Sequence, residues 1–208
     1  MPERIVLGAD TRHQAVARAA GLLREGQVAL LPAEGLYGYH ALAWTLGGSR
    51  EGTDRLEALK PRGPGKGWIA LVARPADAYR WIASVPAPAA VLIHAHWPGA
   101  LTLVLPAGPA LPASLVGPDG TVALRCPGSE FLRAVILAAG GLVISTSANE
   151  PGAPPPASAP AADRVPDGVA LVVDAGTLSG ESSTVARVEG ERVIVLRRGA
   201  VALPGSPP

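Results

Sequence analysis

Three basic side chains lie close together in the segment KPRGPGK: Lys60, Arg62 and Lys66. The prolines restrict the conformations of this loop, so its charges stay near one another. Clustered cations on a restrained loop suit a triphosphate, because they neutralise charge on the nucleotide and on a departing pyrophosphate. The segment is not a P-loop, since its GKG lacks the Ser or Thr that binds magnesium. Taken alone, a solvated basic turn is the alternative interpretation.

A second polar segment, STSAN at residues 145–149, follows directly after an apolar run. Its three hydroxyls and one amide can donate to phosphate oxygens or to a carboxylate while leaving room for a ligand. A helix cap or a Ser/Thr turn explains the segment equally well. Arg125 ends another apolar run, VALR, where a buried guanidinium needs an anionic partner. That partner is either a bound carboxylate or a structural Asp or Glu.

These segments come after predicted strands, whose ends meet in space, so we expect them to share one site. The apolar periodicity predicts helices at 11–25, 52–59, 76–84, 87–96 and 130–139, and strands at 4–7, 28–31, 68–73, 101–105, 121–125, 142–144, 169–173, 184–188 and 193–196. Thr11 and Gln14 predict a capping box for the first helix, and AEGLYGYH after residue 31 is expected to be a loop. The fold class is α/β, of the α+β type: a single domain with a twisted mixed β-sheet flanked by helices and a concave basic cleft.

Composition sets outer bounds on the function. The 208 residues suit one domain, expected at 1–203 with a loose tail at 204–208. The net charge of +1 gives no global field for nucleic acid. A single cysteine, Cys126, excludes an internal disulfide or a multi-cysteine zinc site. It favours a reducing compartment, and we expect a cytoplasmic protein because neither a signal peptide nor an apolar run of membrane length is apparent.

Seven short segments together resemble a known family. PAEGLYG, KPRGPGK, WPGALTLVL, VALRCPG, STSANEPG, SST and LRRG occur in this order between about residue 13 and residue 200. They resemble the YrdC/TsaC family of threonylcarbamoyl-AMP synthases. That family is marked by a Lys-x-Arg pair and a later Ser-x-Asn pair, seen here as Lys60 with Arg62 and Ser147 with Asn149. Each segment is weak alone, whereas seven in order are specific, and they imply a YrdC-like fold.

The resemblance implies a reaction and its participants. L-threonine and bicarbonate or CO2 would form N-carboxy-threonine, whose carboxylate attacks the α-phosphorus of ATP and expels pyrophosphate. The product, threonylcarbamoyl-AMP, would pass to a tRNA threonylcarbamoyl transferase complex that modifies adenosine 37 to t6A. Mg²⁺ would arrive bound to the ATP phosphates, with no metal ligand from the protein. Direct contact with tRNA, as structured double-stranded RNA, is left open.

The resemblance also implies roles for individual residues. The catalytic residues would be Lys60, Arg62, Ser147 and Asn149. The ATP-binding residues would be Arg62, Lys66, Thr121, Ser147 and Arg197. The threonine-binding residues would be Arg125, Ser145, Ser183 and Gly35, with Arg125 taking the threonine carboxylate.

The chain departs from the family pattern at the first of these segments. The family loop often reads PTxTVYGLG, so Ala33 and Gly35 replace hydroxyl residues and His40 replaces a glycine. Leu71 stands where many members carry a histidine. The contact of this loop with threonine, and the choice of amino acid, therefore stay open. We expect His40 to be packed at a loop edge.

Two functions of other kinds compete with this one. The first is carbamoyl adenylation with a different acceptor, as in hydrogenase maturation proteins, which contain a YrdC-like domain. Those proteins also carry acylphosphatase and cysteine-rich zinc segments, which this sequence lacks. The second is a YrdC-like binding module for structured RNA, for which the net charge of +1 gives little support.

Overall fold

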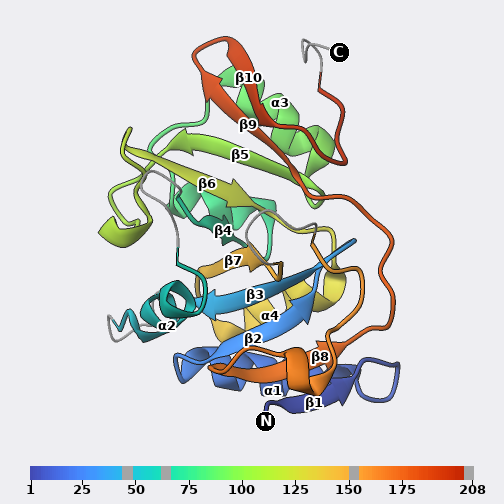
Figure 1. The fold of residues 1–208 in the computed structure, drawn as a ribbon. Helices are drawn as coiled ribbons and strands as arrows, with labels where there is room; N and C mark the ends of the chain where they lie inside the picture. Colours follow the sequence, from blue (N-terminus) through green and yellow to red (C-terminus); the bar gives the residue numbers. More distant parts are fainter. Residues whose placement is uncertain (44–48, 62–66, 150–154, 204–208) are drawn as a thin grey trace.

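A computed structural model describes residues 1–43, 49–61, 67–149 and 155–203. Its centre is a ten-stranded mixed sheet in the order β1-β8-β2-β3-β7-β4-β6-β5-β9-β10, which confirms the predicted mixed sheet flanked by helices (Figure 1). The strands are β1 (Glu3–Val6), β2 (Val28–Pro32), β3 (Tyr37–Leu42), β4 (Ile69–Leu71), β5 (Leu101–Pro106), β6 (Thr121–Arg125), β7 (Val143–Ser147), β8 (Val169–Asp174), β9 (Thr184–Glu189) and β10 (Arg192–Arg197). The helices are α1 (Arg12–Arg24), α2 (Glu51–Leu59), α3 (Ala87–His96) and α4 (Glu130–Ala139), with 3-10 turns η1 (Pro75–Arg80), η2 (Ala113–Leu115) and η3 (Ala162–Arg164).

The strand pairing joins segments that are far apart in the sequence. β3 and β7 are antiparallel, with His40 opposite Ser145. β4 pairs antiparallel with β7 and parallel with β6, so it connects the two halves of the sheet. Parallel pairing of β5 with β9 then attaches the C-terminal hairpin β9–β10. Polar residues of β7, β6 and β10 are thereby carried on one continuous framework.

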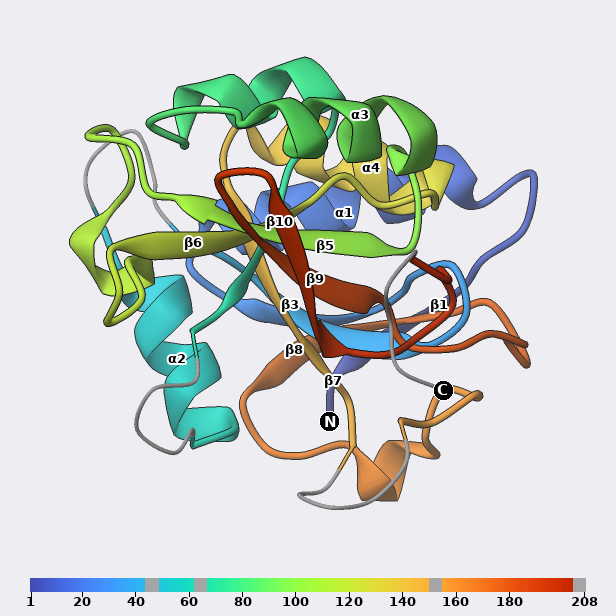
Figure 2. The same cartoon turned by 90° about the horizontal axis from the view of Figure 1, so that it is seen from above.

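Two apolar clusters hold the helices against this sheet. Leu23 of α1 and Val135 of α4 pack with Leu171 and its neighbours in one cluster. The larger cluster includes Ile93 of α3 and Leu103 of β5. Burying each such leucine or valine contributes roughly 1.5–3 kcal/mol relative to leaving it in water. Figure 2 shows α1, α3 and α4 together on one side of the molecule, which leaves the opposite face of the sheet uncovered by these helices.

Three helices differ in how well the sequence predicted them. The bounds predicted for α3 and α4 are confirmed. The hydroxyl of Ser129 caps α4 by accepting from the N–H of Leu132 at 3.2 Å, and Gly140 ends it with a φ of 75°. The capping box predicted for α1 is wrong. The hydroxyl of Thr11 instead donates to the Val6 carbonyl at 2.6 Å and accepts from the Gly8 N–H at 2.8 Å, so it fastens the helix start to β1.

Two other predictions need correction. The loop expected after residue 31 is a hairpin, because Tyr37–Leu42 forms β3 and all six of its residues are buried. Burial on both faces removes the alternation of apolar and polar residues by which a strand is recognised. The helix expected at 76–84 is the shorter turn η1.

Within the described ranges, no helix combines the length and the apolar character that a bilayer span requires.

Candidate functional site

A pocket of about 120 Å³ brings together five of the residues predicted from the sequence. Its walls come from β3, β7, β4 and β6, from residues 182–183, and from the end of β10. This volume is well below the roughly 300–1,000 Å³ of sites for drug-sized ligands, so the pocket suits a molecule of amino-acid size. The predicted residues that line it are Arg125, Ser145, Ser147, Ser183 and Arg197.

The floor of the pocket follows from the register of β3 and β7. Ser145 and Ser147 are two residues apart in β7, so their side chains lie on the same face of the strand. They are paired with His40 and Gly38 of β3, respectively. Gly38 keeps this floor open, because a Cβ there would lie 3.1 Å from Cε1 of His40 and 3.4 Å from Oγ of Ser145. STSAN therefore begins as a strand, and its first and third residues face the ligand space.

Lys60 joins the two segments that the sequence singled out first. Its ammonium donates to the backbone carbonyl of Ser147 at 2.5 Å and to Oδ1 of Asn149 at 2.8 Å. The hydroxyl of Ser147 also donates to Oδ1 of Asn149. The Lys-x-Arg and Ser-x-Asn segments are thus in direct contact beside the pocket. Arg62 and Lys66 lie outside the described residues.

The end of β10 places a second cation in the pocket. The guanidinium of Arg197 donates to the carbonyl of Ser183 at 2.8 Å and to its hydroxyl at 3.0 Å. The Ser183 hydroxyl is 2.9 Å from that of Thr102. Gly199 allows this packing, because a Cβ there would lie 2.1 Å from the carbonyl oxygen of Ser182. Partial desolvation lowers the pKa of Arg197, and the positive charge of Arg125 lowers it further. The charges of the two guanidiniums therefore act on each other.

Arg125 has the structural partner that the sequence analysis left open. One of its terminal N–H groups contacts the carboxylate of Glu34 at 2.7 Å, and its Nε donates to the carbonyl of Gly99 at 2.9 Å. Glu34 also accepts from the N–H of Gly128. These two contacts of Arg125 use two of the five N–H groups of a guanidinium, so a second anion can still bind. Sequence reasoning missed Glu34, although an acid directly after a buried strand was a usable signal.

His40 lies in the sheet and lines the pocket, which corrects its expected place at a loop edge. Its side chain is buried, with Nδ1 2.8 Å from the Gly38 carbonyl and Nε2 3.2 Å from the Ser145 hydroxyl. Burial lowers its pKa to about 4, and the charge of Arg125 adds to this effect. His40 is therefore a neutral imidazole at pH 7.

The lowered pKa of His40 predicts a specific sensitivity to acid. The unfolded chain takes up the proton near pH 6.5 but the folded chain only near pH 4, so stability that is complete above pH 6.5 falls below it. Replacing His40 with phenylalanine should reduce the loss of unfolding free energy between pH 7 and pH 4.5 by roughly 2–3 kcal/mol. Urea unfolding of both proteins at the two pH values measures this. An equal loss in both would contradict it.

Gly35 does not line the pocket. It lies in the turn between β2 and β3, where a Cβ would stand 2.4 Å from Cα of Gly180. The two glycine backbones touch, so a side chain at this position is incompatible with the packing of the two segments. The predicted role of Gly35 in threonine binding stays a prediction, and any such role would be that of backbone.

Replacing Gly35 with alanine is therefore expected to destabilise the protein. The added methyl meets backbone rather than a flexible side chain, and overpacking of this kind costs about 1–3 kcal/mol. Gly21→Ala is a matched control, because no atom lies within 4 Å of its Cβ position in α1. Alanine there should stabilise by about 0.5–1 kcal/mol. Thermal unfolding compares the two, and a Gly35→Ala protein as stable as the wild type would refute the close approach.

Thr121 lies on the pocket face of the sheet but outside the pocket lining. Continuing the register of β4 by two residues sets Thr121 and Ser147 in one row across Gly67. Two strand spacings separate Thr121 from Ser147, which is about 10 Å. Thr121 could therefore contact only a ligand that extends well beyond the 120 Å³ pocket.

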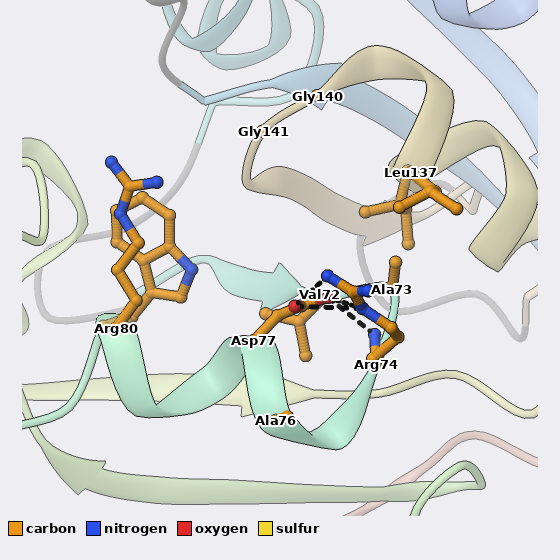
Figure 3. Close-up of a pocket in the computed structure, with 11 residues that line it drawn as sticks. Val72, Ala73, Arg74, Ala76, Asp77, Arg80, Leu137, Gly140 and Gly141 are labelled. Carbon is orange, nitrogen blue, oxygen red and sulfur yellow. Dashed lines mark hydrogen bonds and ion pairs between the residues drawn. The ribbon is translucent and has the colours of Figure 1, made fainter.

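A larger cavity, of about 420 Å³, lies between η1 and the end of α4 (Figure 3). Its lining includes Val72 and, from α4, Leu137, and Arg74 points to Asp77, with a 2.8 Å contact between them. None of the residues predicted from the sequence lines it. Five of the predicted residues line the smaller pocket instead, so we place the candidate site there. Across the described part of the chain, no three His, Cys, Asp or Glu side chains are grouped as metal ligands.

Known proteins resemble this chain in sequence and in fold. A family model for Sua5, YciO and YrdC, described as "Telomere recombination", matches residues 21–199. A threonylcarbamoyl-AMP synthase of Alkalilimnicola ehrlichii is 38% identical over 144 residues, which are 69% of this chain and 73% of the relative. The crystal structure of P. abyssi Sua5 complexed with L-threonine superposes with a TM-score of 0.81 at 28% identity, over 96% of this chain and 57% of the longer Sua5 chain. E. coli YciO shares the fold, with a TM-score of 0.82 at 20% identity over 98% of this chain and 97% of YciO. On the strength of the match over residues 21–199, this chain belongs to the Sua5/YciO/YrdC family.

Proposed function

We propose that this protein is an L-threonylcarbamoyladenylate synthase, a nucleotidyltransferase that makes threonylcarbamoyl-AMP and pyrophosphate from L-threonine, bicarbonate or CO2, and ATP. Relatives that carry the name threonylcarbamoyl-AMP synthase support it. The observation that carries the proposal is the joining of two sites: a pocket of amino-acid size containing two arginines lies directly beside the Lys60, Ser147 and Asn149 cluster.

The pocket would hold the amino acid. The guanidinium of Arg125 takes the threonine carboxylate through N–H groups that Glu34 and Gly99 do not use. The hydroxyls of Ser145 and Ser183 line the same space and supply polar contacts to the rest of the molecule. L-threonine bound to the P. abyssi relative supports an amino acid as the occupant.

The cluster beside the pocket would hold the phosphates of ATP. Displacement at the α-phosphorus needs alignment and charge neutralisation more than a base, because the attacking carbamate is already an anion. Lys60 supplies a charge that Ser147 and Asn149 hold in place, and Arg197 supplies another from the end of β10. Thr121, about 10 Å across the sheet from Ser147, marks the direction in which the nucleotide would extend.

Magnesium would arrive with ATP rather than in a protein cage. The carboxylate of Glu34, which contacts the pocket-lining Arg125, is occupied by Arg125 and Gly128. Mg²⁺ retains several waters readily and binds phosphate oxygens, so the cation can be carried by the nucleotide. It would neutralise charge on the departing pyrophosphate, and Lys60 would do the same from the protein side.

The product would be consumed by another enzyme. A carbamic–phosphoric anhydride is a reactive acyl donor, so its hand-over to a tRNA threonylcarbamoyl transferase complex in the cytoplasm, for t6A at adenosine 37, is the use we propose. Direct contact of this chain with tRNA is part of the same proposal. It would involve the face around the pocket, where Arg125, Arg197 and Lys60 lie.

Pyrophosphate release tests the proposed function directly. The full chain is incubated with MgATP and bicarbonate across a panel of amino acids, and the nucleotide product is identified by mass spectrometry. Release should require both threonine and bicarbonate and should give threonylcarbamoyl-AMP. Release with carbamoyl phosphate instead of threonine would favour the carbamoyl-adenylating alternative. RNA binding without any release would favour the RNA-binding module.

A further inference from the structure

The hydrogen bonds of His40 fix the direction in which the Ser145 hydroxyl points. Nδ1 of His40 is 2.8 Å from the carbonyl oxygen of Gly38, and a carbonyl can only accept. Nδ1 must therefore carry the N–H. A neutral imidazole has a single N–H, so Nε2 presents a lone pair, and the hydroxyl of Ser145 at 3.2 Å must donate to it.

The charged form of His40 would break this arrangement, because both ring nitrogens would then donate. The ring is 1% exposed, and Arg125 is the charged group that acts on it. Burial holds the pKa at about 4, so the ring stays neutral near pH 7. The direction of the Ser145 hydroxyl is therefore constant across the neutral range.

The O–H of Ser145 thus donates to His40, and the hydroxyl oxygen offers only lone pairs to the pocket. A carboxylate or phosphate oxygen has no proton to give there, whereas an amine N–H does. Ser183 differs, since its hydroxyl oxygen accepts from Arg197 at 3.0 Å. The pocket therefore has an anion side at Arg125 and Arg197 and an N–H-accepting side at Ser145.

We propose that His40 is a positioning residue that makes Ser145 the acceptor for the nitrogen of the bound amino acid, and so selects amino acids over carboxylic acids that lack this nitrogen. The inference rests on the proposed function. Carboxylation of a neutral amine forms an N–C bond to CO2 and releases one proton to water, which leaves one N–H on the carbamate. That N–H keeps the same acceptor, so Ser145 would hold the nitrogen before and after this step.

The tautomer of His40 gives a test that needs no activity. Long-range ¹H–¹⁵N correlation spectra of the full chain, labelled at histidine, distinguish the protonated nitrogen from the bare one. The expected result is a neutral ring with its proton on Nδ1, assigned through loss of the signal in His40→Phe. A proton on Nε2, or on both nitrogens, near pH 7 would overturn the inference.

Binding calorimetry tests the selectivity. L-threonine is compared with 3-hydroxybutyrate, which keeps the carboxylate and hydroxyl but has no amine. In His40→Phe, the affinity for threonine should fall about tenfold, the loss of one oriented hydrogen bond, while 3-hydroxybutyrate changes less than about twofold. Ser145→Ala should have the same effect, and the double variant should be no weaker. Tyr39→Phe, a buried neighbour on the other face of β3, is the matched control and should bind like the wild type.

The outcomes separate the two proposals. Equal weakening of both ligands in His40→Phe, or no preference for threonine in the wild type, would show a merely structural histidine and overturn the inference. Threonine-dependent pyrophosphate release together with that result would leave the proposed function standing. Nitrogen-selective binding with no pyrophosphate release would support the inference about His40 and overturn the proposed function.

Discussion

Replacement of Lys60 by alanine is expected to slow threonine-dependent pyrophosphate release by about 10²–10³-fold, the usual loss when one group that stabilises developing charge is removed. The ammonium is held against Ser147 and Asn149, so its charge is fixed beside the pocket. Steady-state rates with saturating ATP and threonine measure the effect. The loss should fall mainly on kcat, because the charge on the leaving group develops during the reaction.

Arg55→Ala is the matched control for this variant. Arg55 is on α2, the helix that ends just before Lys60, and it forms a surface ion pair with Glu51 at 2.6 Å. Such exposed pairs contribute less than about 1 kcal/mol, so rate and stability should stay near those of the wild type. Thermal unfolding of the Lys60→Ala protein verifies that it is folded. A folded variant with the wild-type rate would remove Lys60 from the phosphate site.

Replacing Arg125 should act on the amino acid instead. Loss of a charged partner for a desolvated carboxylate costs about 2–5 kcal/mol, so we expect the KM for threonine to rise by about 100-fold or more while the KM for ATP changes little. Glu34 would be left without its cation, which destabilises the turn after β2. The variant is therefore Arg125→Gln combined with Glu34→Gln, in which neither charge is stranded. Initial rates across threonine concentrations give the two constants.

Arg133→Gln controls for loss of an arginine near the same segment. Its guanidinium donates to the carbonyls of Pro127 and Gly128, at 2.9 and 2.8 Å, yet it does not line the pocket. Its KM for threonine should stay within about twofold of the wild type. A threonine KM unchanged in the Arg125 and Glu34 double variant would show that another group binds the carboxylate.

The sequence was sufficient to predict which segments would meet. Ser145, Ser147 and Arg125 each follow or end an apolar run, and strand ends in one sheet converge whatever the order of the strands. The bounds of α4 were equally accessible, because Ser129 and Gly140 are local signals for its start and end. These predictions succeeded because the information lies within a few residues of each feature.

The contacts that give the site its polarity were not accessible in this way. Glu34 meets Arg125, and His40 meets Ser145 across 105 residues of sequence, only because β3 pairs with β7. The strand β3 was itself missed, since burial on both faces hides the period of two. The hydroxyl of Thr11 likewise donates to the Val6 carbonyl of β1 instead of capping its own helix. In each case a tertiary partner, invisible in the local pattern, decided the structure.

Arg197 belongs to the final strand of the sheet, while Ser145 and Arg125 are made earlier. A polypeptide leaving the ribosome therefore holds no complete pocket until β10 has been synthesised and has docked. A ligand of this pocket cannot serve as a template for the earlier stages of folding, because part of the pocket lining does not yet exist. A message that terminates before residue 197 would encode the other strands of the sheet but not the arginine that completes the lining of the pocket.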